Sequence, residues 1–225
     1  MKAIINFILN LWEYLFGKKK RLKKEAKDYQ EIVENGYNIS FDKSVNEMAA
    51  IDKVNEMEKE ENISAHITLE EATYSRTAEK RGIDNQPNDG QFVRMALLAE
   101  NIFEPLRAAI TKASGKDTPI HITSFFRSDK LNKAIGGASN SQHKANYGSA
   151  IDLDIDGRYS NIINATLFYY IKDNLHFDQL IWEKGNMINP SWVHVSYVGE
   201  GKNRKEVLRM YKDEDNKSVY IPFDL

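Results

Sequence analysis

Apolar and polar residues alternate in several short stretches of the second half of the chain, as they do in β-strands with one buried face. In residues 150–156 apolar side chains alternate with aspartates, which therefore share one face. In residues 192–197 Trp192, His194 and Ser196 point one way and their neighbours the other. Further strands are expected where β-branched and aromatic residues gather, at residues 120–123, 178–183, 207–211 and 219–223.

Helical periodicity dominates the region before these strands. Residues 89–113 carry an apolar stripe at helical spacing, interrupted by Pro105, which can kink the helix. Shorter helices are expected at residues 129–135 and 162–175, and Thr68 begins another with a pattern like a capping box. Because helices come first and mixed strands follow, the sequence predicts an α+β fold. Its sheet would be small and mainly antiparallel, with helices packed on it.

The first residues form a separate apolar segment. Residues 1–17 are rich in apolar side chains but fall short of the roughly 20 residues that a membrane span needs. Asn6, Asn10 and Glu13 recur at helical spacing and predict an amphipathic helix. A basic cluster follows in residues 18–24, and no cleavage site of a signal peptide is visible. The segment fits a helix at a membrane surface, a helix packed on a partner chain or on this domain, or a poor signal anchor.

Composition changes again before the folded region begins. Residues 18–66 are rich in charged residues and predict a tether that is helical or partly disordered. Regular signals of helices and strands begin near residue 67, so a domain is expected over residues 67–225. A chain of 225 residues with 41% hydrophobic residues allows one good-sized core. The net charge of −2 gives no reason to expect a nucleic-acid partner.

A metal site in this chain can use only histidine and carboxylate ligands, because there is no cysteine. His143 lies in a polar turn, Asp152 on the acidic face of a strand, and His194 in mid-strand, where flanking valines would hold it rigidly. These three residues would supply three ligands and leave a fourth position for water, as in catalytic zinc sites. Asp154 shares a face with Asp152 and is the substitute carboxylate.

Four segments carry a resemblance to a known family. They are SFFRSDKLNKAIGGASNSQH (residues 124–143), GSAIDLD (148–154), FDQLIWE (177–183) and WVHVSY (192–197). In this order they resemble the zinc D-Ala-D-Ala metallopeptidases that cleave bacterial peptidoglycan peptides, in particular the branch common in bacteriophages and their hosts. The resemblance spans roughly residues 67–211 and includes SRTAEKRGIDNQP and LLAENIFEPLR near its start.

This resemblance implies a hedgehog-like fold of the D-Ala-D-Ala peptidase type and one zinc ion per domain. The implied ligands are His143, Asp152 and His194. The loop between His143 and Asp152 is longer than is usual in the family, which leaves Asp154 open as the ligand. The spacing from the preceding glycine favours Asp152. The family also has an arginine upstream of the first ligand, and Arg127 matches it.

Residues around these motifs have expected roles. Arg127 would bind a substrate carboxylate or stabilise the oxyanion of a tetrahedral intermediate, with a surface salt bridge as the alternative. Glu183 is the candidate general base, with a structural glutamate as the alternative. Ser141 and Gln142 would contact the substrate or fix their loop. Asp154, if it is not a ligand, would orient a ligand histidine.

The sequence thus predicts a zinc metallopeptidase that cleaves peptidoglycan stem peptides, as a carboxypeptidase or an endopeptidase. Cell-wall remodelling and phage lysis or entry are the corresponding roles. The alternative is a non-catalytic cell-wall-binding or virion structural protein that keeps the fold. The expected partners are a peptidoglycan peptide and, through residues 1–24, a membrane surface. Such a protein would be found at a membrane, in the cell envelope or in a virion.

Overall fold

The computed structural model describes residues 62–156 and 162–223, which all lie in one compact unit, Val54–Leu225. The helix expected at residues 1–17 and the tether up to residue 61 lie outside the described residues. The first described element, β1 (Asn62–Ser64), falls at the end of the range expected for the tether and pairs with β2 (Ile67–Thr68). Within the described ranges, no helix has the length and apolar character needed to cross a membrane.

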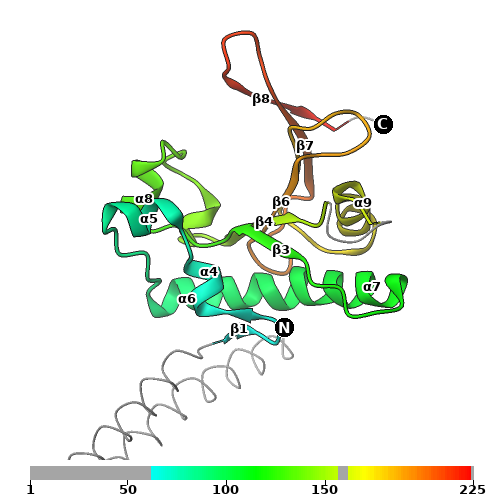
Figure 1. Ribbon diagram of the computed structural model, residues 1–225, viewed down its shortest axis with the longest axis horizontal. Helices are drawn as coiled ribbons and strands as arrows, with labels where there is room; N and C mark the ends of the chain where they lie inside the picture. Colours follow the sequence, from blue (N-terminus) through cyan, green and yellow to red (C-terminus); the bar gives the residue numbers. More distant parts are fainter. Residues whose placement is uncertain (1–61, 157–161, 224–225) are drawn as a thin grey trace, which may run out of the picture. The chain divides into compact units, whose positions relative to one another are not determined.

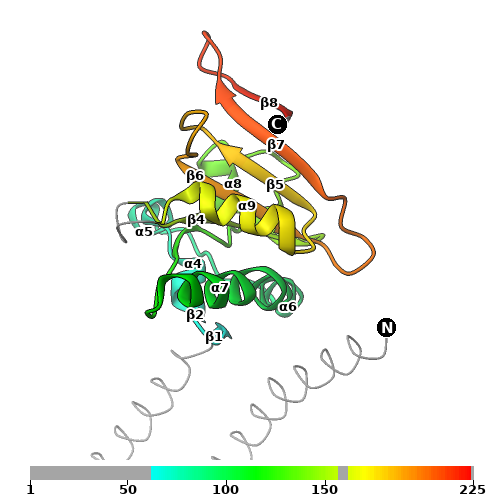
Figure 2. The ribbon, with the colours of Figure 1, turned by 90° about the vertical axis from the view of Figure 1, so that its right-hand side faces the viewer.

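A six-stranded sheet forms the centre of the domain, in the order β3-β4-β6-β5-β7-β8 (Figures 1 and 2). Its strands are β3 (His121–Ser124), β4 (Ser149–Asp154), β5 (Gln179–Glu183), β6 (Trp192–Tyr197), β7 (Glu206–Lys212) and β8 (Ser218–Pro222). Neighbouring strands are antiparallel except β5 and β7, which are parallel. The prediction of an α+β fold with a mainly antiparallel sheet is confirmed.

Helices surround this sheet near the positions predicted from periodicity. They are α4 (Leu69–Thr73), α5 (Arg76–Arg81), α6 (Asp89–Leu98), α7 (Glu104–Ser114), α8 (Asp129–Ala134) and α9 (Asn164–Asn174), with a π-helical segment η2 (Ala99–Phe103) and a 3₁₀ turn η3 (Gln142–Lys144). Polar side chains fix where helices begin. Thr68 Oγ1 accepts from the N–H of Glu71, and Asn88 and Gln91 form a reciprocal capping box.

The segments α6, η2 and α7 continue one another as a long helix beside the sheet (Figure 1). The predicted helix over residues 89–113 is thus confirmed, with a π-helical segment just before Pro105. Proline has no N–H to donate to the preceding turn, and its ring crowds that turn. The chain accommodates Pro105 in a widened turn, in which the N–H of Glu104 donates to Ala99 O.

The two faces of the sheet differ in character. Apolar side chains such as Ile151, Val195 and Trp182 are buried on one face, where α9 packs and the Phe168 and Trp182 rings lie 5.1 Å apart. Phe223, which follows β8, joins this aromatic cluster 5.4 Å from Trp182. The opposite face carries the polar residues of the central strands, and η3 packs against β4 there.

Candidate metal centre

Strand register brings Asp152 and His194 together. β4 and β6 pair with Asp152 opposite His194, and β3 places Ser124 opposite Asp152 on its other side. Directly opposed residues in a sheet point to the same face, so these side chains form a row on the polar face. Ile181 of β5 continues the row next to His194.

His143 reaches this row from the turn η3. Its carbonyl accepts from the N–H of Arg127 at 2.9 Å, and its Nδ1 lies 2.8 Å from Phe125 O. A carbonyl can only accept, so Nδ1 carries the proton and Nε2 keeps a free lone pair. Nε2 lies 3.3 Å from Asp152 Oδ1. Metal-ligating histidines are usually oriented by a hydrogen bond of this kind.

His143, Asp152 and His194 form a compact, buried cluster. His194 Nδ1 lies 2.8 Å from Asp152 Oδ1, and the ring centres of the two histidines are 5.1 Å apart. One ligand atom from each residue lies within 4.8 Å of the others. Two imidazoles and one carboxylate make up a donor set suited to zinc, with a position left for water. The side chains present therefore fit a zinc ion.

The ionisation of the cluster also suits a metal. Burial lowers the pKa of His143 and outweighs the opposing effect of Asp152, which keeps the imidazole neutral. Burial raises the pKa of Asp152, but the neighbouring His143 and His194 outweigh it and hold that pKa well below its usual range. Metal binding needs neutral imidazoles and ionised carboxylates, so this cluster requires no change of protonation at those two groups.

Arg127 contacts the cluster directly. Its Nη2 lies 3.2 Å from Asp152 Oδ2, and its Nε donates to Ser124 Oγ at 3.0 Å. Its ion-pair partner is thus a buried member of the cluster rather than a surface carboxylate. Arg127 and Ser124 also line a cavity of about 310 Å³, together with Tyr74 and Arg76. The guanidinium therefore links the cluster to a space beside it.

Glu183 lies on the same face of the sheet as His194. It follows Ile181 by two residues on β5, and Ile181 is directly opposite His194. Its side chain is buried, with 7% exposed, and among the described residues its Oε2 has no hydrogen-bond partner. Burial raises the pKa of Glu183 to about 7, with a further contribution from Asp152, while His194 opposes the rise. A buried carboxylate with a raised pKa and one oxygen left unbonded has the properties of an acid–base group.

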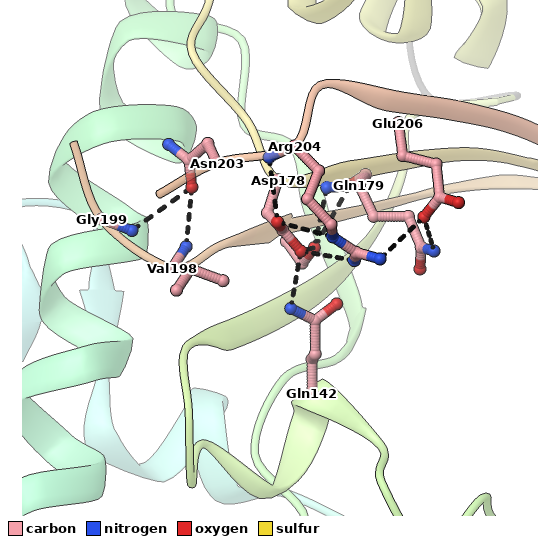
Figure 3. A network of polar contacts seen from close by, with 9 residues as sticks. Gln142, Asp178, Gln179, Val198, Gly199, Asn203, Arg204 and Glu206 are labelled. Atoms are coloured by element: carbon pink, nitrogen blue, oxygen red, sulfur yellow. Dashed lines mark hydrogen bonds and ion pairs between the residues drawn. The ribbon is translucent and has the colours of Figure 1, made fainter. Parts of the chain in front are cut away.

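The amide of Gln142 is bound to another part of the chain (Figure 3). Its Nε2 donates to Asp178 Oδ2 at 2.9 Å, and the guanidinium of Arg204 donates to both oxygens of the same carboxylate, at 2.9 and 2.6 Å. Burial raises the pKa of Asp178, but hydrogen bonds from Arg204 and Gln142 hold it below its usual value. These contacts favour the loop-fixing role of Gln142 over substrate contact.

Ser141 and Asp154 lie beside the cluster without joining it. The carbonyl of Ser141 accepts from the N–H of Lys144 at 3.2 Å, within the turn that carries His143. Asp154 Oδ1 accepts from Asn164 Nδ2 at 2.9 Å and from the N–H of Asp156 at 3.1 Å. Asp154 therefore ties the end of β4 to the start of α9, and these contacts do not support the expected role of orienting a ligand histidine.

Sequence reasoning missed Asp178 and Ser124. Asp178 follows the buried Phe177 and precedes an apolar strand, and an acidic residue in that position is a signal that could have singled it out. Ser124 is recognisable only from its register opposite Asp152, which pairs two distant segments. No local sequence pattern predicts the register between β3 and β4.

The fold and the cluster define the class of metal-dependent hydrolases with an open His-Asp-His site. The family model of Peptidase M15 matches residues 65–196, more than half of the 225 residues, so the chain belongs to the M15 family of zinc-dependent metallopeptidases. The matched range contains His143, Asp152, His194, Arg127 and Glu183. A search of the curated proteins gave no match.

Proposed function

We propose that this protein is a zinc-dependent hydrolase that cleaves peptide bonds in the stem peptides of bacterial peptidoglycan. The observation that carries the proposal is the buried cluster of His143, Asp152 and His194 beside Glu183, whose Oε2 has no hydrogen-bond partner among the described residues. Membership of the M15 family supports peptidase chemistry. The resemblance of the sequence motifs to D-Ala-D-Ala metallopeptidases supports peptidoglycan as the source of the substrate.

Zinc would be held by His143 Nε2, Asp152 Oδ1 and His194 Nδ1. When bound, the ion supplies a Lewis acid for the scissile carbonyl and lowers the pKa of a water molecule to about 7. The hydrogen bond between His143 Nδ1 and Phe125 O keeps the imidazole in the tautomer that leaves Nε2 available. The chain's contribution is to present these three atoms together in a site shielded from solvent.

Glu183 is the proposed general base. Its Oε2 takes the proton of the attacking water and returns it to the leaving amine. A pKa raised to about 7 places this carboxyl near the range in which it can both accept and return a proton at neutral pH. The absence of a hydrogen-bond partner for Oε2, among the residues described, leaves that oxygen available for the transfer.

Arg127 is the proposed electrostatic group. Its Nη2 and Nε are engaged with Asp152 and Ser124, and a guanidinium has further N–H donors. Those donors would stabilise the negative charge on the carbonyl oxygen during cleavage, or bind a carboxylate of the substrate. Arg76 on the wall of the adjacent cavity adds a second cation there. Two cations at one cavity support a substrate that carries a free carboxylate, whether at its end or on a side chain.

The test is zinc content combined with digestion of purified cell walls. Purified protein should hold one zinc ion per chain and should release products that mass spectrometry identifies. Release of D-Ala alone would identify a carboxypeptidase, and release of longer peptides an endopeptidase. Zinc-loaded protein that binds cell walls without cleaving them would overturn the proposal in favour of the wall-binding or virion structural protein. A chain that needs no open metal site has no reason to keep Glu183 and Arg127 beside it.

We also propose that residues 1–24 contact a membrane surface, on the basis of the apolar segment 1–17 and the basic cluster that follows it. Flotation with anionic lipid vesicles tests this directly. The full chain should float with the vesicles and a chain lacking residues 1–24 should not. Equal flotation of both would dismiss the membrane proposal and leave the packing on a partner chain or on this domain.

A further inference from the structure

The hairpin formed by β7 and β8 lies outside the range that matches the M15 family. It adds two strands to the sheet on the side of β5, as Figure 2 shows. Glu183 on β5 is opposite Met210 on β7, and Met210 is opposite Tyr220 on β8. Residues opposite one another share a face. Tyr220 is therefore on the same face of the sheet as Glu183 and the metal cluster.

Tyr220 is subject to the charges of Glu183 and Asp152 although its strand lies at the edge of the sheet. β8 is separated from β4, which carries Asp152, by three intervening strands. Even so, the pKa of Tyr220, which burial raises first, is raised further by the charges of both Glu183 and Asp152. The phenol of a tyrosine is protonated at neutral pH, so the Tyr220 hydroxyl can donate a hydrogen bond.

Contacts on the opposite face hold the hairpin in place. Phe223, directly after β8, packs with its ring centre 4.6 Å from Phe168 and 5.4 Å from Trp182. The N–H of Phe223 also donates to Val207 O at 3.0 Å. A strand anchored in this way presents the side chains of its other face in a defined position. Tyr220 itself is 51% exposed, and within the described ranges its hydroxyl has no hydrogen-bond partner.

We propose that Tyr220 contacts the substrate: its hydroxyl donates a hydrogen bond to a main-chain carbonyl of the peptide bound over Glu183 and the metal cluster. A peptide lying there offers carbonyl oxygens as acceptors, and the exposed phenol can donate to one of them in place of water. The inference rests on the proposed peptidase function and deepens it. It assigns part of the peptide recognition to the β7–β8 hairpin, which follows the residues that match the family model.

Tyr220→Phe is the variant that tests the contact, because it removes only the hydroxyl. Tyr211→Phe is a matched control: Tyr211 is a partly exposed tyrosine, 41% exposed, on the same hairpin but on the opposite face of the sheet. With zinc-loaded full-length protein and a peptidoglycan stem peptide, Tyr220→Phe should lower kcat/KM roughly 3- to 10-fold, the range for one lost hydrogen bond. Tyr211→Phe should stay within about twofold of wild type, and neither variant should change zinc content.

A second measurement separates this inference from the proposed function. The zinc-loaded Glu183→Gln variant is labelled with ¹³C at the hydroxyl-bearing ring carbon of its tyrosines and followed by NMR. The signals of Tyr220 and Tyr211 are assigned because each disappears in the corresponding Tyr→Phe variant. Addition of the stem peptide should shift the signal of Tyr220 and leave that of Tyr211 in place. If the peptide binds without shifting Tyr220, or if Tyr220→Phe behaves like Tyr211→Phe in turnover, the inference is overturned while the peptidase function stands. If the stem peptide neither binds nor is cleaved, the proposed substrate class is the part that fails.

Discussion

Glu183 is buried, and its Oε2 has no hydrogen-bond partner within the part of the chain that the structure describes. Removal of its charge gives the sharpest test of the proposed chemistry. Glu183→Gln should keep the fold and the zinc but lower kcat by about 10²–10⁴-fold, as expected for loss of a general base. Glu206→Gln, on the neighbouring strand β7, is the control. In the wild type, activity should fall as the pH drops through the pKa of Glu183, about 7 in the metal-free protein and lower beside a bound cation. Near-normal turnover of Glu183→Gln would mean that another group takes the proton.

The raised pKa of Glu183 also predicts how the stability of the metal-free protein depends on pH. The pKa of Glu183 is about 7 in the folded protein against the ordinary 4.5, so the folded state binds a proton more tightly between these pH values. The free energy of unfolding of the metal-free protein should therefore decrease as the pH rises from about 4.5 to about 7, by on the order of 3 kcal/mol from this group. Urea unfolding at several pH values would show Glu183→Gln gaining stability relative to wild type as the pH rises. A constant difference between the two proteins would contradict the shift.

Separate replacement of Asp152 and Asp154 by asparagine tests which of the two carboxylates is the zinc ligand. Asp152→Asn should lose most of the bound zinc, because Oδ1 of Asp152 is the atom shared by the two histidines of the cluster. Asp154→Asn should retain zinc, since the Asp154 carboxylate contacts Asn164 and the main chain of Asp156. Metal analysis after dialysis measures both. A larger loss of zinc in Asp154→Asn would reverse the assignment of the ligand.

At the scale of secondary-structure elements, a hydrogen bond from Gln142 in η3 to Asp178 ties this turn to the sheet. Gln142 donates to Asp178 at the start of β5 and directly precedes His143. Gln142→Ala should weaken zinc binding about 10-fold, the lower end of the effect of residues that orient ligands. Gln179→Ala is a matched control, because the Gln179 amide bonds to Glu206 at 2.6 Å in the same region without touching η3. Equal zinc affinities in competition with a chelator would show that Gln142 does not position His143.

Elements were easier to predict than the contacts between them. The alternation in residues 150–156 and 192–197 and the stripe over 89–113 identified β4, β6 and the long helix, because each pattern is local. The grouping of His143, Asp152 and His194 was predicted from the types and positions of these residues and from the motif resemblance, but the register that brings them together was not. The parallel pairing of β5 with β7 joins segments distant in sequence, and no local pattern encodes it. The bond of Gln142 to Asp178 was unforeseen for the same reason.

At the scale of the whole molecule, the start of the domain can be tested by truncation. β1 pairs with β2, and Ile63 on β1 is buried. Removal of residues 1–61 should leave a folded, zinc-binding domain with unchanged Tm. Removal of residues 1–66 also deletes β1 and exposes apolar surface, so it should lower Tm. Thermal unfolding of the two shortened chains measures the difference, and loss of folding in the 62–225 chain would show that the first 61 residues belong to the core.

The hydrogen bond from His143 to Phe125 has a consequence for how this centre tolerates mutation. Its acceptor is the main-chain carbonyl at position 125, and every amino acid carries that carbonyl. Random mutagenesis at position 125 can therefore damage the packing of the buried ring, but no change of side chain deletes the acceptor itself. The orientation of the His143 imidazole is therefore set by the course of the backbone at residue 125 and not by the side chain there. Over generations of sequence drift, that contact would persist as long as the chain leaving β3 keeps its course.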